Sequence, residues 1–144
     1  MSKTINDFKP QNNSFKKYLK LALMGIFLIC WIITITVFWL YTNPTDAMGF
    51  SILYLWIILP LGGIMTSLLL GFFYSWDTWF YYWALAVGAL YMLAKFVTFS
   101  LSNMLEFRVM NLPNFGMLVS ASVISLLALW VGNLLRKLRR ERRN

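Results

Sequence analysis

Four long apolar stretches constrain the fold of this 144-residue chain more than any other feature of its sequence. A helix rises about 1.5 Å per residue, so about 20 apolar residues are needed to cross the hydrocarbon core of a bilayer, which is about 30 Å thick. The stretches that reach this length are residues 19–41, 50–74, 78–100 and 114–135. Within lipid, a helix satisfies its own backbone groups. The sequence therefore predicts an all-α integral membrane protein, a bundle of four transmembrane helices.

The composition argues against a water-soluble fold. Hydrophobic residues make up 60% of the chain and charged residues 12%, whereas about a quarter of the residues of a soluble domain are charged. So few charges would leave the core of a soluble protein uncovered. The charges also gather at the two ends of the chain. Residues 1–18 form a short polar and basic lead and residues 136–144 a basic tail, on either side of a transmembrane domain at 19–135.

The distribution of lysine and arginine predicts how the chain is oriented. Cytoplasmic segments next to membrane helices carry an excess of these residues. Both ends of the chain are basic, and an even number of spans places both ends on one side, so we expect both termini in the cytoplasm. The connection between the first two spans carries only Asp46, whereas residues 75–78 contain no lysine or arginine and favour neither side. We expect a multi-pass protein of the plasma (cytoplasmic) membrane.

The turn between the second and third spans lies in an aromatic segment, FFYSWDTWFYYW, at residues 72–83. Tryptophan and tyrosine concentrate at the interface between membrane and water, so this segment predicts an aromatic belt at the inner surface. Asp77 or Ser75 is expected to cap the helix that follows, where a carboxylate also complements the helix dipole. An alternative is an aromatic pocket for a cation or a flat ligand, with Asp77 as its counter-charge.

Small residues at helical spacing predict where the helices approach one another. Helix association in lipid depends on close packing, and small side chains let backbones come near. Three spans carry such a stripe, and the residues predicted to mediate helix packing are Gly63, Ser67, Gly71, Ala84, Gly88, Ala121, Ser125, Ala128 and Gly132. The first span is bulky apart from Gly25, so we expect it to pack at the periphery of the bundle.

Pro60 lies well inside the second span and is followed by the sequence Leu-Gly-Gly. A proline removes a backbone hydrogen bond and clashes with the preceding turn, so a kink is predicted at Pro60. The kink is either a hinge for gating or a static bend that fits the helix to its neighbours. The static interpretation is preferred, because proline and glycine are both common in membrane helices.

Three charged residues near the outer end of the third span are candidates for a functional or structural role: Lys95, Glu106 and Arg108. Lys95 is the one charged residue that lies away from the first two residues of a predicted span, and charges in that setting are costly and rarely without a role. A helix that continued to Arg108 would be longer than the core is thick, so we expect a break near Ser102 or Asn103. Folding back would bring Glu106 to Lys95. The resulting ion pair would either have a structural role, closing the outer end of the bundle, or have a role toward a substrate or a proton.

The basic tail is expected to continue the fourth helix into the cytoplasm. Each lysine or arginine near an anionic leaflet contributes about 1 kcal/mol to membrane attachment. The residues expected to contact lipid headgroups are Arg136, Lys137, Arg139, Arg140, Arg142 and Arg143. A bilayer with anionic headgroups is thus an expected partner. Nucleic-acid binding is not favoured, because no recognition fold accompanies the tail.

The residue types that the chain lacks indicate which functional classes to expect. It has no histidine and a single cysteine, Cys30, so the commonest general base and the commonest metal ligands are missing. We expect no catalytic residue, metal or cofactor, and a membrane enzyme that acts on lipid is the least favoured class. We predict a non-enzymatic accessory or interaction subunit of a membrane complex, or a self-associating homo-oligomer. The alternative is a small oligomeric transporter or channel that uses Lys95 and Glu106.

Overall fold

The computed structural model of the chain describes residues 10–108 and 110–142, and these residues form helices and connections without a strand. In chain order the elements are α1 (Pro10–Tyr41), η1 (Pro44–Asp46), α2 (Ala47–Phe50), η2 (Ser51–Ile58), α3 (Leu59–Phe73), α4 (Trp79–Lys95), η3 (Phe96–Ser100), α5 (Leu101–Phe107) and α6 (Phe115–Glu141). The element η1 is a 3-10 helix, whereas η2 and η3 are π-helical. Residues 1–9 of the predicted lead and Arg143 of the tail lie outside the described residues.

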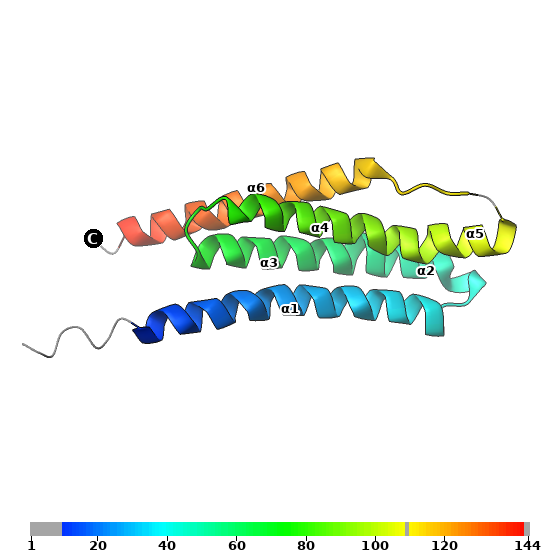
Figure 1. Cartoon of the computed structure of the whole chain (residues 1–144), viewed down its shortest axis with the longest axis horizontal. Helices are drawn as coiled ribbons and strands as arrows, with labels where there is room; N and C mark the ends of the chain where they lie inside the picture. The colour runs from blue at the N-terminus through cyan, green and yellow to red at the C-terminus, as the bar shows by residue number, and fades with distance from the viewer. Residues whose placement is uncertain (1–9, 109, 143–144) are drawn as a thin grey trace, which may run out of the picture.

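Several elements follow one another without a break, so the chain forms four long helical rods (Figure 1). The rods that are long and apolar enough to cross a membrane are Phe15–Tyr41, Ala47–Phe73, Trp79–Phe107 and Phe115–Glu141. The prediction of an all-helical chain with four helices of transmembrane length is confirmed. The expected helical continuation of the fourth span into the basic tail is confirmed too, because α6 ends at Glu141.

The two ends of the bundle hold different parts of the chain (Figure 1). The start of α1, the end of α6 and the turn between α3 and α4 lie at one end, which we call the terminal end. The element η1, the end of α5 and the connection from α5 to α6 lie at the other, which we call the distal end. The rods therefore lie side by side along the long axis of the molecule (Figure 1).

The third rod is longer than the sequence predicts. The expected break near Ser102 or Asn103 is wrong, because α4, η3 and α5 form one continuous helix. No proline or glycine occurs in residues 96–107, so nothing in that segment removes a backbone donor or favours a turn. The helix ends at Arg108, whose φ of 53° lies in the left-handed region and whose N–H donates to the Met104 carbonyl.

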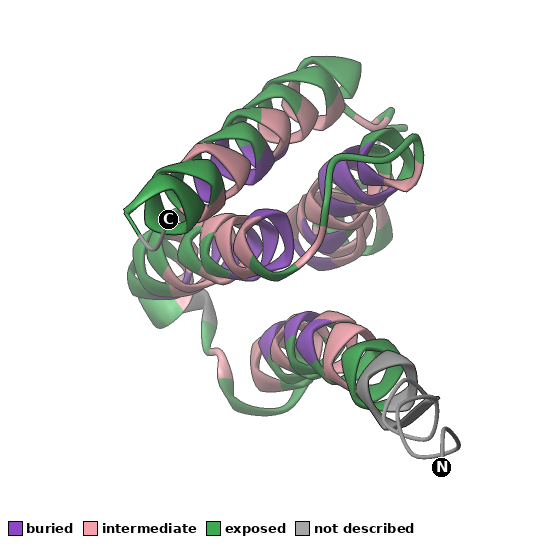
Figure 2. Ribbon diagram, turned by 90° about the vertical axis from the view of Figure 1, so that its left-hand side faces the viewer, coloured by how far each residue is buried: buried purple, intermediate pink, exposed green. Residues whose placement is uncertain are grey.

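The helix α6 is the main packing partner within the bundle. It lies against both α3 and α4, while α3 and α4 contact each other only slightly. The helix α1 packs on the outside of this three-helix unit, mainly against α3, and stands apart in Figure 2 with its buried side toward the others. It begins at Pro10, ahead of the expected start of the span near residue 19. Its peripheral position is the one expected for a helix that is bulky along its length.

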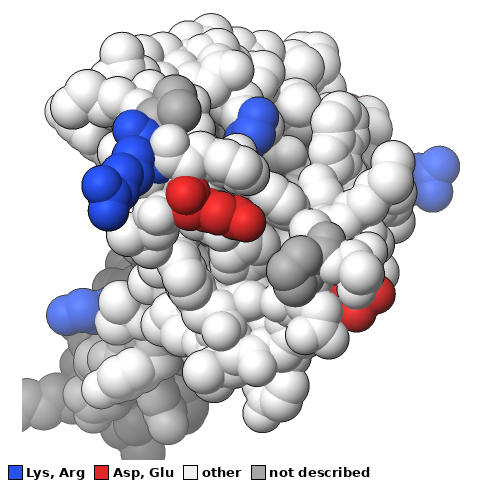
Figure 3. Space-filling view, turned by 90° about the vertical axis from the view of Figure 1, so that its right-hand side faces the viewer, with Lys and Arg blue, Asp and Glu red and all other residues white. Residues whose placement is uncertain are grey.

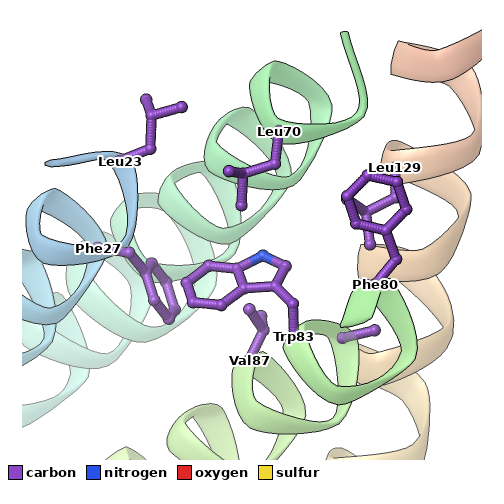
Figure 4. Packing of buried hydrophobic residues seen from close by; sticks show 8 residues of the cluster. Leu23, Phe27, Leu70, Phe80, Trp83, Val87 and Leu129 are labelled. Atoms are coloured by element: carbon purple, nitrogen blue, oxygen red, sulfur yellow. The ribbon is translucent and has the colours of Figure 1, made fainter. Parts of the chain in front are cut away.

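Two hydrophobic clusters occupy the space between the rods. The larger cluster contains the buried residues Leu23, Phe27, Leu70, Phe80, Trp83, Ala84, Val87 and Leu129, and most of its members are labelled in Figure 4. The second cluster contains Phe50, Leu55, Leu59 and Ala94. Phe27 meets Trp83 edge to face with ring centroids 6.0 Å apart, which joins α1 to α4. In a membrane the surrounding lipid is as apolar as these side chains, so the clusters stabilise the bundle through packing contacts.

Candidate functional site

Glycines let α6 approach α3 and α4 closely. A methyl group built on Gly71 of α3 would overlap the Leu129 carbonyl of α6, and one built on Gly132 of α6 would overlap the Leu68 carbonyl of α3. A methyl group on Gly88 of α4 would likewise overlap the backbone of α6. Only a residue without a side chain permits these contacts. Since Gly71 and Gly132 lie near the terminal end, the rods close that end of the bundle by backbone contact.

Three polar side chains bond to one another next to this closed region. The Trp83 indole N–H donates to Ser67 Oγ over 3.2 Å, and the hydroxyls of Ser67 and Ser125 bond over 2.8 Å. All three side chains are buried, with Ser67 at 0% and Ser125 at 1% exposure. The network connects α3, α4 and α6, and it gives each of the three buried polar atoms a hydrogen-bond partner.

The small residues singled out in the sequence lie between helices of the same chain. Gly63, Ala84 and Ala128 are buried, and Ala121 is half-buried. A methyl group on Gly63 would come within 3.1 Å of Val87 of α4. These residues therefore take part in packing within the chain, while Gly63 and Ala121 also line the cavity described below.

A π-helical stretch precedes Pro60, the position of the predicted kink. At the end of that stretch the Leu59 N–H donates to the Tyr54 carbonyl, five residues back. In a π-helix each N–H bonds to the carbonyl five residues back, so the donor to the Leu55 carbonyl would be residue 60. Residue 60 is a proline and has no N–H, so the Leu55 carbonyl lacks a backbone donor. The Tyr91 hydroxyl of α4 donates to that carbonyl over 2.9 Å. This bond holds the irregular stretch against its neighbour, which favours the static interpretation of Pro60.

The hydrogen bonds between rods were missed by the reasoning from sequence. Besides the bond from Tyr91, the Trp31 indole N–H of α1 donates to the Leu90 carbonyl of α4 over 2.7 Å. A proline inside a span signals that one carbonyl needs a donor from elsewhere. The identity of that donor depends on the tertiary arrangement, which a single sequence does not display.

A cavity of about 320 Å³ lies between the second, third and fourth rods, toward the distal end. Its wall is mainly apolar and includes Pro60, Val87 and Met117. The exposed residues Trp56 and Ile124 belong to the wall, so the cavity opens on the side of the bundle between η2 and α6. Lys95 does not line it. This cavity is therefore separate from the charge that the sequence singles out.

Lys95 is the last residue of α4 and lines a second hollow, which we call the distal cleft, of about 270 Å³. The wall of the distal cleft is mainly polar, and the polar residues that line it with Lys95 are Ser100, Asn103, Asn111 and Asn114. The backbone of Lys95 lies about 24 Å along the helix from Trp79, at about 1.5 Å per residue. A hydrocarbon core about 30 Å thick that began at the level of Trp79 would end about 6 Å beyond the backbone of Lys95.

The ion pair predicted between Lys95 and Glu106 is not formed in the described part of the chain. Both residues lie on one continuous helix, which separates their backbones by about 15 Å. Glu106 is exposed and does not line the distal cleft, and Arg108 is exposed as well. Figure 3 views the distal end and shows a few separate charged side chains on a mostly uncharged surface. The prediction failed because it required the helix to fold back.

At the terminal end the aromatic turn meets a lysine of α1. The Lys20 ammonium lies 3.3 Å from the ring centroid of Trp79, and Trp79 stacks on Trp83 with centroids 6.0 Å apart. Asp77 is exposed, and its carboxylate accepts a hydrogen bond of 2.7 Å from the N–H of Thr78, the residue before α4. The expected side-chain cap of α4 is not formed. The cation on this aromatic surface belongs to the chain itself, which does not favour a pocket for an external cation.

The basic residues of the tail occupy the last turns of α6. Arg136 is half-buried, and the exposed residues are Lys137, Arg139, Arg140 and Arg142. The Arg139 guanidinium lies 5.6 Å from the ring centroid of Phe72. Arg136 has a buried Nη1 atom without a hydrogen-bond partner among the described residues. The basic end of α6 therefore packs along the end of α3 and still presents free cations at the surface.

Comparison of the chain with protein-family models, with curated proteins and with solved structures finds no match. Across residues 10–108 and 110–142, no group of three or more histidine, cysteine, aspartate or glutamate side chains is placed to hold a metal ion. The function of the chain is therefore argued from its own geometry, in which the closed terminal end and the open distal end are the main features.

Proposed function

We propose that this chain is a multi-pass membrane protein that works by binding, as a non-enzymatic accessory or interaction subunit of a larger membrane complex. The observation that supports the proposal is the closed interior. Glycine contacts close the terminal end, and the bond between Ser67 and Ser125 fills the neighbouring layer. The cavity of about 320 Å³ is apolar and stops short of Lys95. The described residues of a single chain thus form no polar path across the bundle that links these features, which supports action through the outer surface.

The helix α1 is the element best placed to contact a partner. The small residues of the other rods face inward, whereas α1 has the smallest buried share of the four, 17% of its most apolar window. Its outward side chains include Ile26, Ile29 and Ile33, which are each at least half exposed. The Thr36 hydroxyl on this face bonds to a carbonyl of its own helix, so it adds no free polar group. We expect a partner helix to pack along this apolar face.

The proposed orientation has both ends of the chain in the cytoplasm. The start of α1, with Lys16 and Lys20, lies at the same end of the bundle as the basic end of α6 (Figure 1). Lysine and arginine concentrate on the cytoplasmic side, where anionic lipids attract them. The aromatic turn at residues 74–78 lies at this end too, where tryptophan and tyrosine rings suit the headgroup level as an aromatic belt. The plasma membrane is the proposed location.

Purification of the tagged full-length chain from its native membrane, after crosslinking and in a mild detergent, tests this function. We expect one partner protein to be recovered in a fixed ratio. Ile29→Trp on the outward face of α1 is expected to lower the recovered partner roughly fivefold, equivalent to about 1 kcal/mol. Leu127→Trp on α6 is the matched control, since Ile29 and Leu127 are 58% and 57% exposed. Recovery of the chain only as a monomer would contradict the proposal.

A small oligomeric transporter or channel is the second candidate, and the distal cleft is the observation that favours it. Lys95 lies in a polar hollow near the edge of the core, where a path between subunits would have to begin. The same purification separates the two candidates. Complexes made only of this chain, together with a solute flux that Lys95→Met abolishes in liposomes, would favour the transporter. A complex with a different polypeptide favours the accessory subunit.

A further inference from the structure

The distal cleft has two walls that come from different parts of the chain. One wall is a single face of the rod formed by α4, η3 and α5, and it consists of Met92, Lys95, Phe96, Phe99, Ser100 and Asn103. The other wall comes from the connection after α5 and the first turn of α6, and it consists of Asn111, Leu112, Asn114 and Met117. The third rod does not break, and its continuity places Ser100 and Asn103 on the same face as Lys95.

Several side chains that can donate hydrogen bonds line this cleft. Among the described residues that line it, Lys95 is the only charged one, and none of them has a carboxylate. A lysine ammonium offers three donors and an asparagine amide group offers two. The Oδ1 atom of Asn114 already accepts the Gly116 N–H over 2.9 Å, which leaves the NH₂ group of Asn114 to meet a ligand. The start of the long helix α6 adds partial positive charge. The complementary ligand is an anion with several acceptor atoms.

We infer that the distal cleft binds a phosphate group. Phosphate oxygens accept several charge-assisted hydrogen bonds at once, which suits one ammonium surrounded by amides and a hydroxyl. Lys95 lies near the limit of the hydrocarbon core, the level next to the phosphates of lipid headgroups. The apolar part of the wall, including Phe96 and Phe99, suits the chains attached to such a phosphate. The phosphate belongs to a phospholipid or is a free anion that enters from water.

This inference goes beyond the proposed function. It requires no partner protein, because all lining residues belong to one chain. It also holds for either orientation in the membrane, because phospholipid headgroups occur at both surfaces. A failure to find a partner protein would therefore leave it unaffected.

Native mass spectrometry of the full-length chain released from lipid nanodiscs tests the inference. The nanodiscs contain digalactosyldiacylglycerol, which has no phosphate, and a minor fraction of phosphatidylglycerol. We expect the wild type to retain phosphatidylglycerol and Lys95→Met to retain roughly tenfold less, which corresponds to about 1.4 kcal/mol. Lys95→Arg should preserve retention. Arg108→Met is the matched control, because Arg108 is an exposed cation of the distal end outside the cleft, and its loss should leave retention within about twofold.

A second arm identifies the source of the phosphate. The chain in an uncharged detergent is titrated with inorganic phosphate, and binding is followed by the shift of its thermal unfolding. Retention of phosphatidylglycerol with no response to inorganic phosphate identifies the lipid headgroup, whereas the reverse identifies the free anion. Circular dichroism checks that Lys95→Met folds, and Asn103→Leu, on the same wall as Lys95, provides a second variant with reduced binding. Equal binding by the wild type and both variants, or an equal loss in Arg108→Met, would overturn the inference.

Discussion

At the scale of single residues, the bundle depends on side chains that supply hydrogen bonds which the backbone lacks. Pro60 leaves the Leu55 carbonyl without a donor, and the Tyr91 hydroxyl of the neighbouring rod supplies one. In the interior of a membrane no water is available to donate in place of the tyrosine. An unpaired carbonyl there therefore carries the full free-energy cost of a buried polar group without a partner. Pro60 and Tyr91 therefore act as a pair, although they lie on different helices.

Tyr91→Phe is expected to lower the free energy of unfolding by about 1–3 kcal/mol, the cost of a buried polar group without a partner. Unfolding of the purified chain by SDS in mixed micelles, followed by circular dichroism, measures this change. Tyr82→Phe is the control, because Tyr82 lies on the same helix and is 72% exposed, and its change should stay within about 0.5 kcal/mol. Pro60→Ala restores an N–H, so it should reduce the loss caused by Tyr91→Phe. Equal losses for the two tyrosine variants would count against this pairing.

At the scale of helices, stability depends on how closely α6 approaches α3. Gly71→Ala is expected to destabilise the chain by about 1–3 kcal/mol, because its methyl group would overlap the Leu129 carbonyl and push the two helices apart. Gly25→Ala in α1 is the matched control, since no atom lies within 4 Å of the added methyl group. That change should be neutral or stabilising by up to about 1 kcal/mol, as alanine is the better helix former. The same SDS titration compares them, and equal stability of both variants would contradict the close approach.

The positions of the helices were more predictable than their ends. The four spans follow from a physical requirement, the length of apolar chain that crosses a bilayer, and the stripe that contains Ser67 follows from helical spacing. The end of the third rod at Arg108 was not predictable, because a left-handed arginine has no distinctive sequence signal. The π-helical stretches were missed for a related reason. The stretch before Pro60 is stabilised by Tyr91, a residue far away in the sequence.

At the scale of the whole molecule, the two ends of the bundle differ in packing. Gly71 and Gly132 bring α3 and α6 into contact at the terminal end, whereas the bulkier Trp56 and Ile124 line the open cavity toward the distal end. Lys95 was identified from sequence because a charge inside a span is conspicuous. The residues around Lys95 were not predicted from the sequence, because Asn111 and Asn114 line the distal cleft from a separate segment. The predicted partner Glu106 does not line it.

The orientation proposed for the molecule is that the four rods cross a membrane with the terminal end in the cytoplasm. Cysteine labelling in intact cells tests this orientation most directly. Single cysteines are introduced into a chain whose Cys30 is replaced by alanine, and they are labelled with a membrane-impermeant maleimide. We expect Met48→Cys and Met110→Cys, at the distal end and 77% and 85% exposed, to be labelled from outside. Ser75→Cys and Arg142→Cys, at the terminal end, should react only after the cells are permeabilised. Labelling of Ser75→Cys or Arg142→Cys in intact cells would contradict the claim.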